Sequence, residues 1–299
     1  MNNAEQILGI DWGTTNRRAY LLDAQGTLLS EHVDSEGILA AGKDFTGSLG
    51  ALLAKMAIGT GEVILSGMIG SRNGWREAPY LTSETMLTAL PGALMSLEAP
   101  FPGLRCRIVP GYRVDHPHGA PDVMRGEETQ VFGALKMGAA EGWFLLPGTH
   151  SKWVRVAGGR VVDIITFMTG ELFGLLSQHG TLAPLMQEKA DMPEAFEAGL
   201  CAAQHGGFTH AAFGCRALVV TDAMPAAHAH SYLSGLLIGA ELAEVRRRDD
   251  AAPGQAIQVI GSPELTVHYL HALDFFDMRA RQWPADAVYL AALRALAGR

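Results

Sequence analysis

The chain has 299 residues, of which 48% are hydrophobic, and a formal net charge of −8. This composition indicates a globular protein with a large core, and the acidic balance argues against a nucleic-acid-binding protein, because the phosphate backbone requires a basic surface. The three cysteines form no CxxC pair, which argues against a disulfide framework or a zinc ribbon. No signal peptide and no run of about 18 apolar residues stands out, so we expect a cytoplasmic protein with no membrane partner.

The first 31 residues are predicted to form three strands. Apolar runs indicate strands over residues 7–11 and 18–22, and a third strand over 27–31 follows a turn signal. Between the first two strands lies the small, hydroxyl-rich turn Gly13-Thr14-Thr15-Asn16, directly after Asp11. The sequence therefore places one carboxylate next to several small hydrogen-bond donors.

The same pattern recurs in the second half of the chain. A strand over 143–146 leads into Gly148-Thr149-His150-Ser151, and strands over 153–156 and from 161 follow. The repetition of a whole architecture predicts two similar α/β domains, although two unrelated hairpins are the alternative.

Further elements complete the predicted order. They are a helix over 47–57, a strand over 62–65, a helix over 127–140, a long helix over 231–248, a strand over 257–260 and a last helix over 285–296. Glu127 and Glu128 stand at the start of one helix, where negative charge suits the helix dipole. The linker between the two halves is expected around 136–142.

The two Gly-Thr turns point to phosphate binding. Tight turns of this composition present successive backbone N–H groups, which bind anions, and two of them could hold the phosphates of a nucleotide from both sides. A carboxylate such as Asp11 beside phosphates is best explained by Mg²⁺, which takes one or two carboxylates and keeps several waters. No GxxxxGK[ST] motif occurs and no GxGxxG follows a strand, so neither a P-loop enzyme nor a dinucleotide-binding fold is supported.

These motifs resemble those of a known superfamily. IDWGTTNRRAYLLD, residues 10–23, resembles the first phosphate motif of sugar kinases in the actin/hexokinase/Hsp70 superfamily, most closely the glycerol-kinase type. LPGTHSKW resembles the second phosphate motif, and VIGSPEL, residues 259–265, the adenosine motif. Over nearly its whole length the chain is similar to the 2-dehydro-3-deoxygalactonokinase family, through SGMIGSRNGWREAPY, DVMRGEETQVFGAL, LPGTHSKWV and TFMTGELFGLL.

The resemblance implies a fold and a domain organisation. We expect two ribonuclease-H-like α/β domains of the actin/hexokinase type around a central nucleotide cleft. The first, 1–138, would hold the first phosphate motif, the sugar-acid pocket and the base. The second, 139–299, would hold the second phosphate motif and the adenosine motif, with the last helix packing back on the first domain.

The resemblance also implies the nucleotide and metal site. The residues that it assigns to nucleotide binding are Gly13, Thr14, Thr15, Gly148, Thr149, His150, Ser151, Gly261 and Ser262. Asp11 is expected to hold Mg²⁺ through water.

The catalytic base is implied by a shared motif. In enzymes of the glycerol-kinase type a Gly-Asp-Gln motif opens the helix before the second phosphate motif, and its Asp is the base. Here Gly126-Glu127-Glu128 occupies that position, so Glu127 is the candidate base and Asp122 its rival. The alternative is that both glutamates only begin a helix.

The implied substrate is a 2-keto-3-deoxy sugar acid, phosphorylated at its terminal hydroxyl. Its carboxylate calls for a planar bidentate donor. Arg72 matches a substrate-binding arginine of the glycerol-kinase type, and Trp75 could stack on the carbon chain. Arg18 and Asn16 are the other candidates, and a solvated surface position is the alternative for each arginine.

The expected function is that of an ATP- and Mg²⁺-dependent kinase for 2-dehydro-3-deoxy-D-galactonate, acting in galactonate catabolism. The alternatives are a kinase for a related sugar acid and a non-catalytic nucleotide-binding protein of the same fold. A polyphosphate hydrolase would need a basic channel, against which the acidic balance argues. The epimer and the oligomeric state stay open, and a homodimer paired through apolar helices such as 285–296 is one option.

Overall fold

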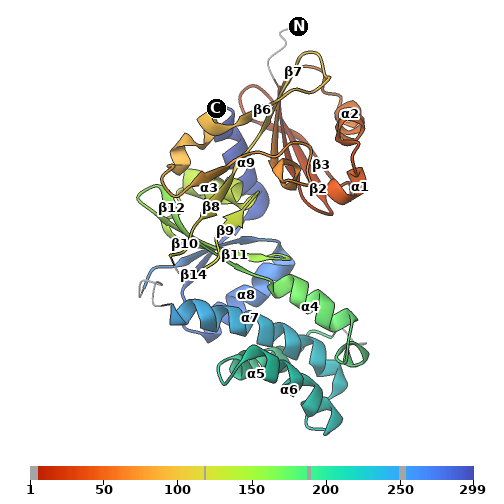
Figure 1. Cartoon of the computed structure of the whole chain (residues 1–299), viewed down its shortest axis with the longest axis vertical. Coiled ribbons are helices and arrows are strands. Elements are labelled where there is room, and N and C mark those ends of the chain that lie inside the picture. Colours follow the sequence, from red (N-terminus) through yellow and green to blue (C-terminus); the bar gives the residue numbers. More distant parts are fainter. Residues whose placement is uncertain (1–5, 118, 187–189, 249–253) are drawn as a thin grey trace. The chain divides into compact units, whose positions relative to one another are not determined.

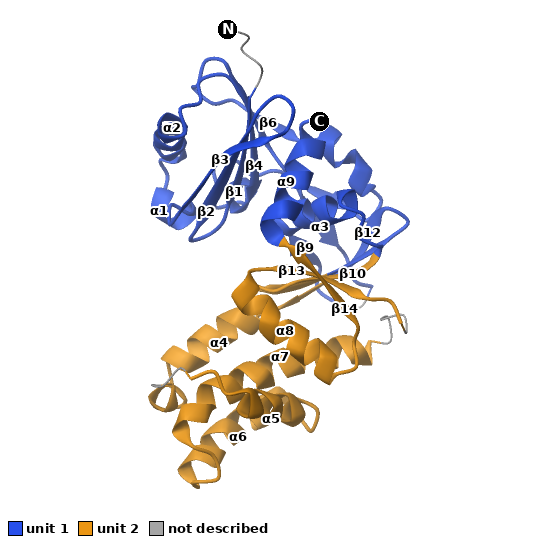
Figure 2. Cartoon of the chain, turned by 180° about the vertical axis from the view of Figure 1, so that it is seen from behind, with its two compact units in different colours: residues 1–141, 154–164, 285–299 blue, residues 142–153, 165–284 orange. Residues whose placement is uncertain are grey.

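The computed structural model describes residues 6–117, 119–186, 190–248 and 254–299 and divides into two compact units (Figures 1 and 2). Unit 1 consists of Met1–Glu141, Val154–Ile164 and Ala285–Arg299, and unit 2 of Gly142–Trp153 and Ile165–Pro284.

Unit 1 is built on a six-stranded sheet in the order β3-β2-β1-β4-β7-β6. Its strands are β1 (Gln6–Trp12), β2 (Arg17–Leu22), β3 (Leu28–Asp34), β4 (Gly61–Gly67), β6 (Met95–Leu97) and β7 (Leu104–Ile108). The central strand β1 pairs antiparallel with β2 and parallel with β4, and β4 pairs parallel with β7. Residues 7–10 of β1 are all buried, because a central strand of this kind is covered on both faces.

Helices and a small second sheet complete unit 1. The helices are α1 (Ile38–Ala41), α2 (Phe45–Lys55), α3 (Glu127–Lys136) and α9 (Ala285–Leu296), with short 3₁₀ segments η1 (Met68–Gly70) and η2 (Leu87–Ala93). The small sheet joins β5 (Tyr80–Thr82), β8 (Gly111–Val114) and β9 (Asp122–Met124) in the order β5-β8-β9. Helix α2 packs its buried Leu49, Leu52 and Leu53 into the same core as Leu8 and Ile10 of β1.

The apolar face of the last helix is used inside its own unit. Helix α9 packs on α3, and five of its residues are buried: Val288, Tyr289, Ala292, Leu293 and Leu296. The apolar character of 285–296 is thus explained without a second chain.

Unit 2 is built on a five-stranded sheet in the order β12-β11-β10-β13-β14. Its strands are β10 (Gly142–Leu146), β11 (Ser151–Ala157), β12 (Arg160–Phe167), β13 (Ile257–Gly261) and β14 (Ala280–Pro284), and the division into units runs through β11 and β12. Strand β13 pairs parallel with both β10 and β14. The order matches β3-β2-β1-β4-β7 of unit 1, so the expected repeat of one α/β architecture is confirmed.

Five helices of the described residues belong to unit 2. They are α4 (Thr169–Gln178), α5 (Pro193–Ala203), α6 (Phe208–Val220), α7 (Ala229–Arg247) and α8 (Pro263–Phe275), with 3₁₀ segments η3 (Ala183–Leu185) and η4 (Ala226–His228). Helix α7 contacts α4, α5, α6 and α8, and twelve of its residues are buried. Within the described ranges, no helix combines the length and apolar character needed to cross a bilayer.

Several predicted boundaries differ from the structure by one to four residues, and two of these differences bear on the site. The helix at 127 ends at Lys136 rather than at residue 140, because Gly138 adopts a φ of +88° that a helix cannot continue through. Strand β11 begins at Ser151 rather than at 153, so Ser151 is a strand residue at the end of the turn.

Candidate active site

The turn after β1 presents free backbone amides. The carbonyl oxygens of Gly13, Thr14 and Thr15 accept hydrogen bonds from the backbone N–H groups of residues 37–39, at 3.0–3.2 Å. Within the described chain the amides of Thr14 and Thr15 donate to nothing, and both residues are exposed. A turn fixed through its carbonyls and open at its amides is suited to binding an anion.

Asp11 lies at the carboxyl end of β1, beside this turn. In the sheet it stands opposite Arg18 of β2 and Ser66 of β4. Burial raises the pKa of the Asp11 carboxyl to about 6, the Arg18 guanidinium lowers this pKa, and the nearby charge of Glu127 raises it. Asp11 and Glu127 are therefore close enough to influence each other electrostatically.

Two glycines bring the start of α3 to the ends of β1 and β4. Gly67 ends β4 with a φ of +84°, and Gly126 precedes α3 with a φ of +113°. A Cβ atom on Gly126 would lie 3.2 Å from the Gly67 Cα, and a Cβ atom on Gly67 would lie 3.1 Å from Asp11 Oδ1. Gly67 is therefore in close contact with both Asp11 and Gly126, and Glu127 directly follows Gly126.

The two glutamates at the start of α3 have different environments. The Arg125 amide donates to Glu127 Oε2 (2.9 Å), and the Gly126 amide donates to Glu128 Oε2 (2.7 Å). Glu127 is half-buried, whereas Glu128 is fully buried. Burial raises the pKa of Glu128 to about 8, with a further contribution from the charge of Glu127, so Glu128 is largely protonated at neutral pH. Of the two, only Glu127 is suited to accept a proton.

Asp122, the rival base, lies at the start of β9. Its Oδ1 accepts a hydrogen bond from the backbone amide of Val123 at 2.7 Å.

The second turn, Gly148 to Ser151, follows β10 and rests on the first turn of α4. The Glu171 amide donates to the Thr149 carbonyl oxygen (2.8 Å), and His150 Nε2 lies 2.6 Å from Glu171 Oε2. His150 and Thr149 are exposed. The turn is fixed from its carbonyl side, as in unit 1.

A buried carboxylate on α7 holds this turn in place. Glu241 accepts hydrogen bonds from Ser151 Oγ (2.7 Å), Trp153 Nε1 (2.7 Å) and Tyr269 Oη (2.9 Å), and a short one from Thr169 Oγ1. Burial raises the pKa of the Glu241 carboxyl, and the hydrogen bonds lower it. The Ser151 hydroxyl is buried and donates to Glu241. Ser151 could therefore bind a ligand through its backbone rather than through its side chain.

The residues of the adenosine motif lie at the same edge of the sheet as the second turn. Gly261 ends β13, which runs parallel to β10, and Ser262 is the N-cap of α8. Ligands of open α/β sheets bind at this carboxyl edge.

The residues expected to bind the sugar acid lie in different environments. The Arg72 side chain is 87% exposed, and its Nε lies 3.8 Å from Glu77 Oε1. Trp75 is half-buried and stacks on Phe45, with ring centroids 6.3 Å apart, so one ring face is occupied. Arg18 is exposed, with its Nη1 3.5 Å from Asp286 Oδ1, and Asn16 is exposed in the first turn.

Sequence reasoning missed Arg125 and Glu241. Arg125 precedes the Gly-Glu-Glu motif and is only 8% exposed, and Glu241 is 2% exposed. A charged residue directly before Gly126 is the one signal that could have drawn attention to Arg125. Nothing near Glu241 in the sequence points to Ser151.

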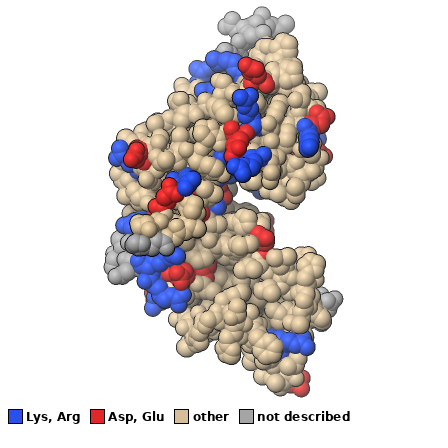
Figure 3. Space-filling model, in the orientation of Figure 1, with Lys and Arg blue, Asp and Glu red and all other residues tan. Residues whose placement is uncertain are grey.

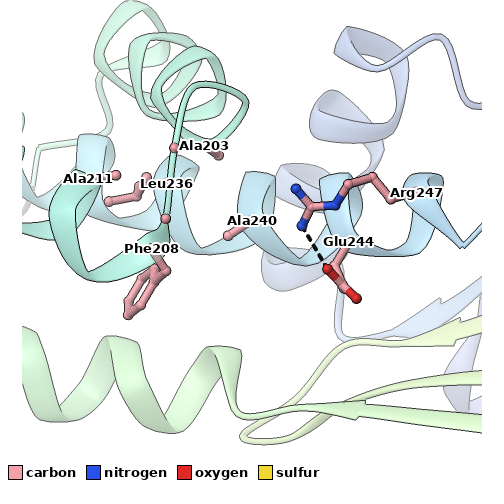
Figure 4. A pocket seen from close by; sticks show the side chains of 9 residues that line it. Ala203, Phe208, Ala211, Leu236, Ala240, Glu244 and Arg247 are labelled. Carbon is pink, nitrogen blue, oxygen red and sulfur yellow. Dashed lines mark hydrogen bonds and ion pairs between the residues drawn. The ribbon is translucent and has the colours of Figure 1, made fainter.

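Two pockets of unit 2 lie apart from the residues of these sites. On the face drawn in Figure 3, basic side chains lie in separate groups mixed with acidic ones. Figure 4 shows a pocket of about 430 Å³ in unit 2 that is lined mainly by apolar residues such as Phe208 and Leu236, with the Glu244–Arg247 ion pair (2.7 Å) at one end. Neither this pocket nor a second one of about 220 Å³ contains any site residue expected from the sequence.

The described residues offer few side chains to a metal ion. Among the described residues, no group of three His, Cys, Asp or Glu side chains is placed to hold a metal ion. One or two carboxylates such as Asp11 and Glu127 fit Mg²⁺, which takes its other ligands from phosphates and water.

Known proteins resemble the chain over nearly its full length. A family model described as 2-keto-3-deoxy-galactonokinase matches residues 11–296. The 2-dehydro-3-deoxygalactonokinase of Escherichia coli (strain K12) is 34% identical over 300 residues, which cover 98% of this chain and 97% of that protein. The probable 2-dehydro-3-deoxygalactonokinase DgoK1 of Rhizobium meliloti (strain 1021) is 34% identical over 310 residues, covering 99% and 98%. A crystal structure of a candidate 2-dehydro-3-deoxygalactonokinase from Sinorhizobium meliloti has a TM-score of 0.88 at 33% identity and covers 97% of this chain and 95% of that one.

Replacing Glu241 by Leu should lower the free energy of unfolding by about 3–5 kcal/mol, because several buried donors lose their acceptor. The matched control is Glu244→Leu on the same helix. Among the described residues, Glu244 pairs with Arg247 and Arg248 at the surface, so its loss should cost about 1 kcal/mol or less. Urea denaturation of the three proteins measures both values, and equal losses would contradict the structural role of Glu241.

Glu128→Gln should stabilise the protein increasingly as the pH rises. The folded-state pKa of about 8 lies above the ordinary 4.5, so the stability of the protonated form is fully present below pH 4.5 and is lost as the pH rises through 8. A glutamine cannot lose that proton. The free energy of unfolding of the variant, relative to that of wild type, should therefore rise by up to about a few kcal/mol between pH 5 and pH 9. The difference in melting temperature between the two proteins should rise with it. The exposed Glu31→Gln serves as control, and parallel curves for Glu128→Gln and wild type would refute the prediction.

Proposed function

The chain belongs to the 2-keto-3-deoxy-galactonokinase family, and we propose that it transfers the γ-phosphate of ATP to the terminal (C6) hydroxyl of 2-dehydro-3-deoxy-D-galactonate. One observation supports the proposal most directly. Asp11, Glu127 and the open amides of the first turn lie together at the carboxyl ends of β1 and β4. A phosphate site, a metal carboxylate and a base in one place are the parts that phosphoryl transfer requires.

The nucleotide site is proposed to use backbone groups. In unit 1 the amides of Thr14 and Thr15 would bind phosphate oxygens, since Gly13 and its neighbours are held through their carbonyls. In unit 2 Gly148, Thr149 and the backbone of Ser151 would do the same, with His150 as a side-chain donor. Gly261 and Ser262 would contact the adenosine.

Asp11 is proposed to hold Mg²⁺ through water. The carboxyl is partly withdrawn from solvent and lies within the electrostatic influence of Glu127, and a divalent cation would relieve the repulsion between the two. When bound, Mg²⁺ would neutralise phosphate charge and orient the β- and γ-phosphates.

Glu127 is proposed as the general base. The Arg125 amide fixes one oxygen of its carboxylate, and the other oxygen has no hydrogen-bond partner in the described chain. That oxygen would accept the proton of the C6 hydroxyl as it attacks the γ-phosphorus. Glu128 is unsuited, because it is buried and protonated at neutral pH.

On the acceptor side, Asn16, Arg18, Arg72 and Trp75 stay candidates for binding the sugar acid. Of these four described residues, Arg18 interacts with an acid of the proposed site, because its guanidinium lowers the pKa of the Asp11 carboxyl.

The test is ADP release from Mg²⁺-ATP with a panel of acceptors: 2-keto-3-deoxygalactonate, its gluconate epimer, glycerol, a hexose and water. Release that is strong only with the galactonate derivative supports the proposal. An equal response to both epimers would widen the substrate to 2-keto-3-deoxy sugar acids. Release equal to the water control throughout would refute a sugar-acid kinase.

Asp11→Asn should raise the Mg²⁺ concentration needed for half-maximal activity by at least an order of magnitude, because the metal loses its charged anchor. Steady-state rates over a Mg²⁺ titration measure this. An unchanged Mg²⁺ requirement would remove Asp11 from the metal site.

Glu127→Gln should reduce kcat by roughly 10²- to 10⁴-fold, the usual range for loss of a general base, while ATP still binds. Asp122→Asn is the matched comparison and should retain most of the activity. If Asp122→Asn is the inactive variant and Glu127→Gln is not, the base is Asp122.

A further inference from the structure

Arg125 carries a buried guanidinium that is only partly paired. Arg125 lies in the chain between β9 and α3, and the residue is 8% exposed. Its Nη2 donates to the Ala78 carbonyl oxygen (2.8 Å), and the guanidinium carbon lies 4.3 Å from the centre of the Tyr80 ring. Its Nε and Nη1 are shielded from solvent and have no hydrogen-bond partner among the described residues.

A second unpaired polar atom lies in the segment 70–78, whose first and last residues contact the Arg125 side chain. A Cβ atom on Gly70 would be 3.1 Å from Arg125 Nη1, so the guanidinium lies against the backbone directly before Ser71. The Ser71 hydroxyl is also buried and has no partner in the described chain. The Ala78 amide donates to the Gly70 carbonyl oxygen (2.9 Å), which ties together the two ends of the segment 70–78.

A buried guanidinium without an acidic partner is unfavourable. Desolvation of such an ion costs several kcal/mol, and proteins usually offset this with a carboxylate and a full set of hydrogen bonds. No ion pair of Arg125 with an acidic side chain occurs among the described residues. A group that the free protein leaves unpaired at this cost is a candidate for pairing with a ligand.

We propose that Arg125 and Ser71 bind the carboxylate of the sugar acid. This inference rests on the proposed function and assigns the substrate's carboxylate to a residue that the sequence did not indicate. The unpaired Nη1 can donate to one oxygen of a carboxylate, and the hydroxyl of Ser71, the residue after Gly70, can donate to the other. The backbone amide of Arg125 holds Glu127, so one residue would connect the carboxylate site with the base at the other end of the substrate.

Access requires a local movement. Nε, Nη1 and the Ser71 hydroxyl are all shielded from solvent in this structure, and the segment that follows Ser71 exposes Arg72, Asn73, Arg76 and Glu77. We therefore expect the segment 72–77 to shift when the carboxylate enters. Arg72, by contrast, is solvated and weakly paired with Glu77, so it is a poorer carboxylate ligand in this conformation.

The experiment is calorimetric binding of the sugar acid and of its uncharged C1 amide to the full chain, with Mg²⁺ and a non-hydrolysable ATP analogue present. Wild type is compared with Arg125→Met, Arg125→Lys, Arg72→Met and the exposed control Arg113→Met. Arg125→Met should weaken binding of the acid by about 10- to 100-fold and that of the amide by much less, because only the acid uses the charged hydrogen bonds. Arg125→Lys should retain part of the preference for the acid, and Arg113→Met all of it.

The melting temperature separates this role from a structural one. Loss of the preference for the acid in Arg125→Met, with an unchanged or higher melting temperature, supports the carboxylate site. A variant that melts much lower and loses both ligands equally would show a structural role and overturn the inference, as would a preference lost in Arg72→Met and kept in Arg125→Met. Wild type that binds neither ligand and phosphorylates no sugar acid would instead overturn the proposed function itself.

Discussion

The close contact between Gly67 and Gly126 determines where the acids of unit 1 lie. Both residues have a positive φ that other residues rarely adopt. A Cβ atom on Gly126 would lie 3.2 Å from the Gly67 Cα, and a Cβ atom on Gly67 would lie 2.9 Å from the Trp12 carbonyl oxygen. This contact places the first turn of α3 against the carboxyl ends of β1 and β4. Glu127 thereby enters the electrostatic range of Asp11, which is far away in the sequence. The charge arrangement of the site thus depends on the absence of two side chains.

Unit 2 reaches a similar turn by a different means. The first turn is fixed by backbone hydrogen bonds from residues 37–39, whereas the second is held by the first turn of α4 and by the buried Glu241. Four donors from three other elements converge on that carboxylate, so β11, α4 and α8 are connected through one residue of α7. In both units, backbone amides at the start of a helix donate to carbonyl oxygens of the turn, and unit 2 adds the hydrogen bonds to Glu241.

Local patterns predicted much of the fold but little of the site's interior. The strands around Gly13 and Gly148 and the helix that starts at Glu127 follow from apolar runs and turn residues, which act over a few neighbouring positions. The roles of Ser151 and Arg125 depend on contacts with Glu241 and with the Gly70 to Ala78 segment, 90 and about 50 positions away. Burial separates Arg125 from Arg72, since sequence alone shows two arginines in loops. The small sheet and helices α4, α5, α6 and α8 also lay outside the predicted elements, although α5 and α8 begin with a proline, which is a helix-start signal.

The pairing of two adjacent glutamates has a physical logic. A general base must be ionised, and a second negative charge on the next residue would oppose that ionisation. Burial removes the conflict, because Glu128 holds its proton at neutral pH and leaves Glu127 beside a neutral neighbour. Glu128 still accepts the Gly126 amide, so it keeps the helix start in place without adding charge. The sequence Glu-Glu therefore divides two tasks between identical side chains: the buried one fixes the geometry of the helix start, and the half-buried one is the proposed base.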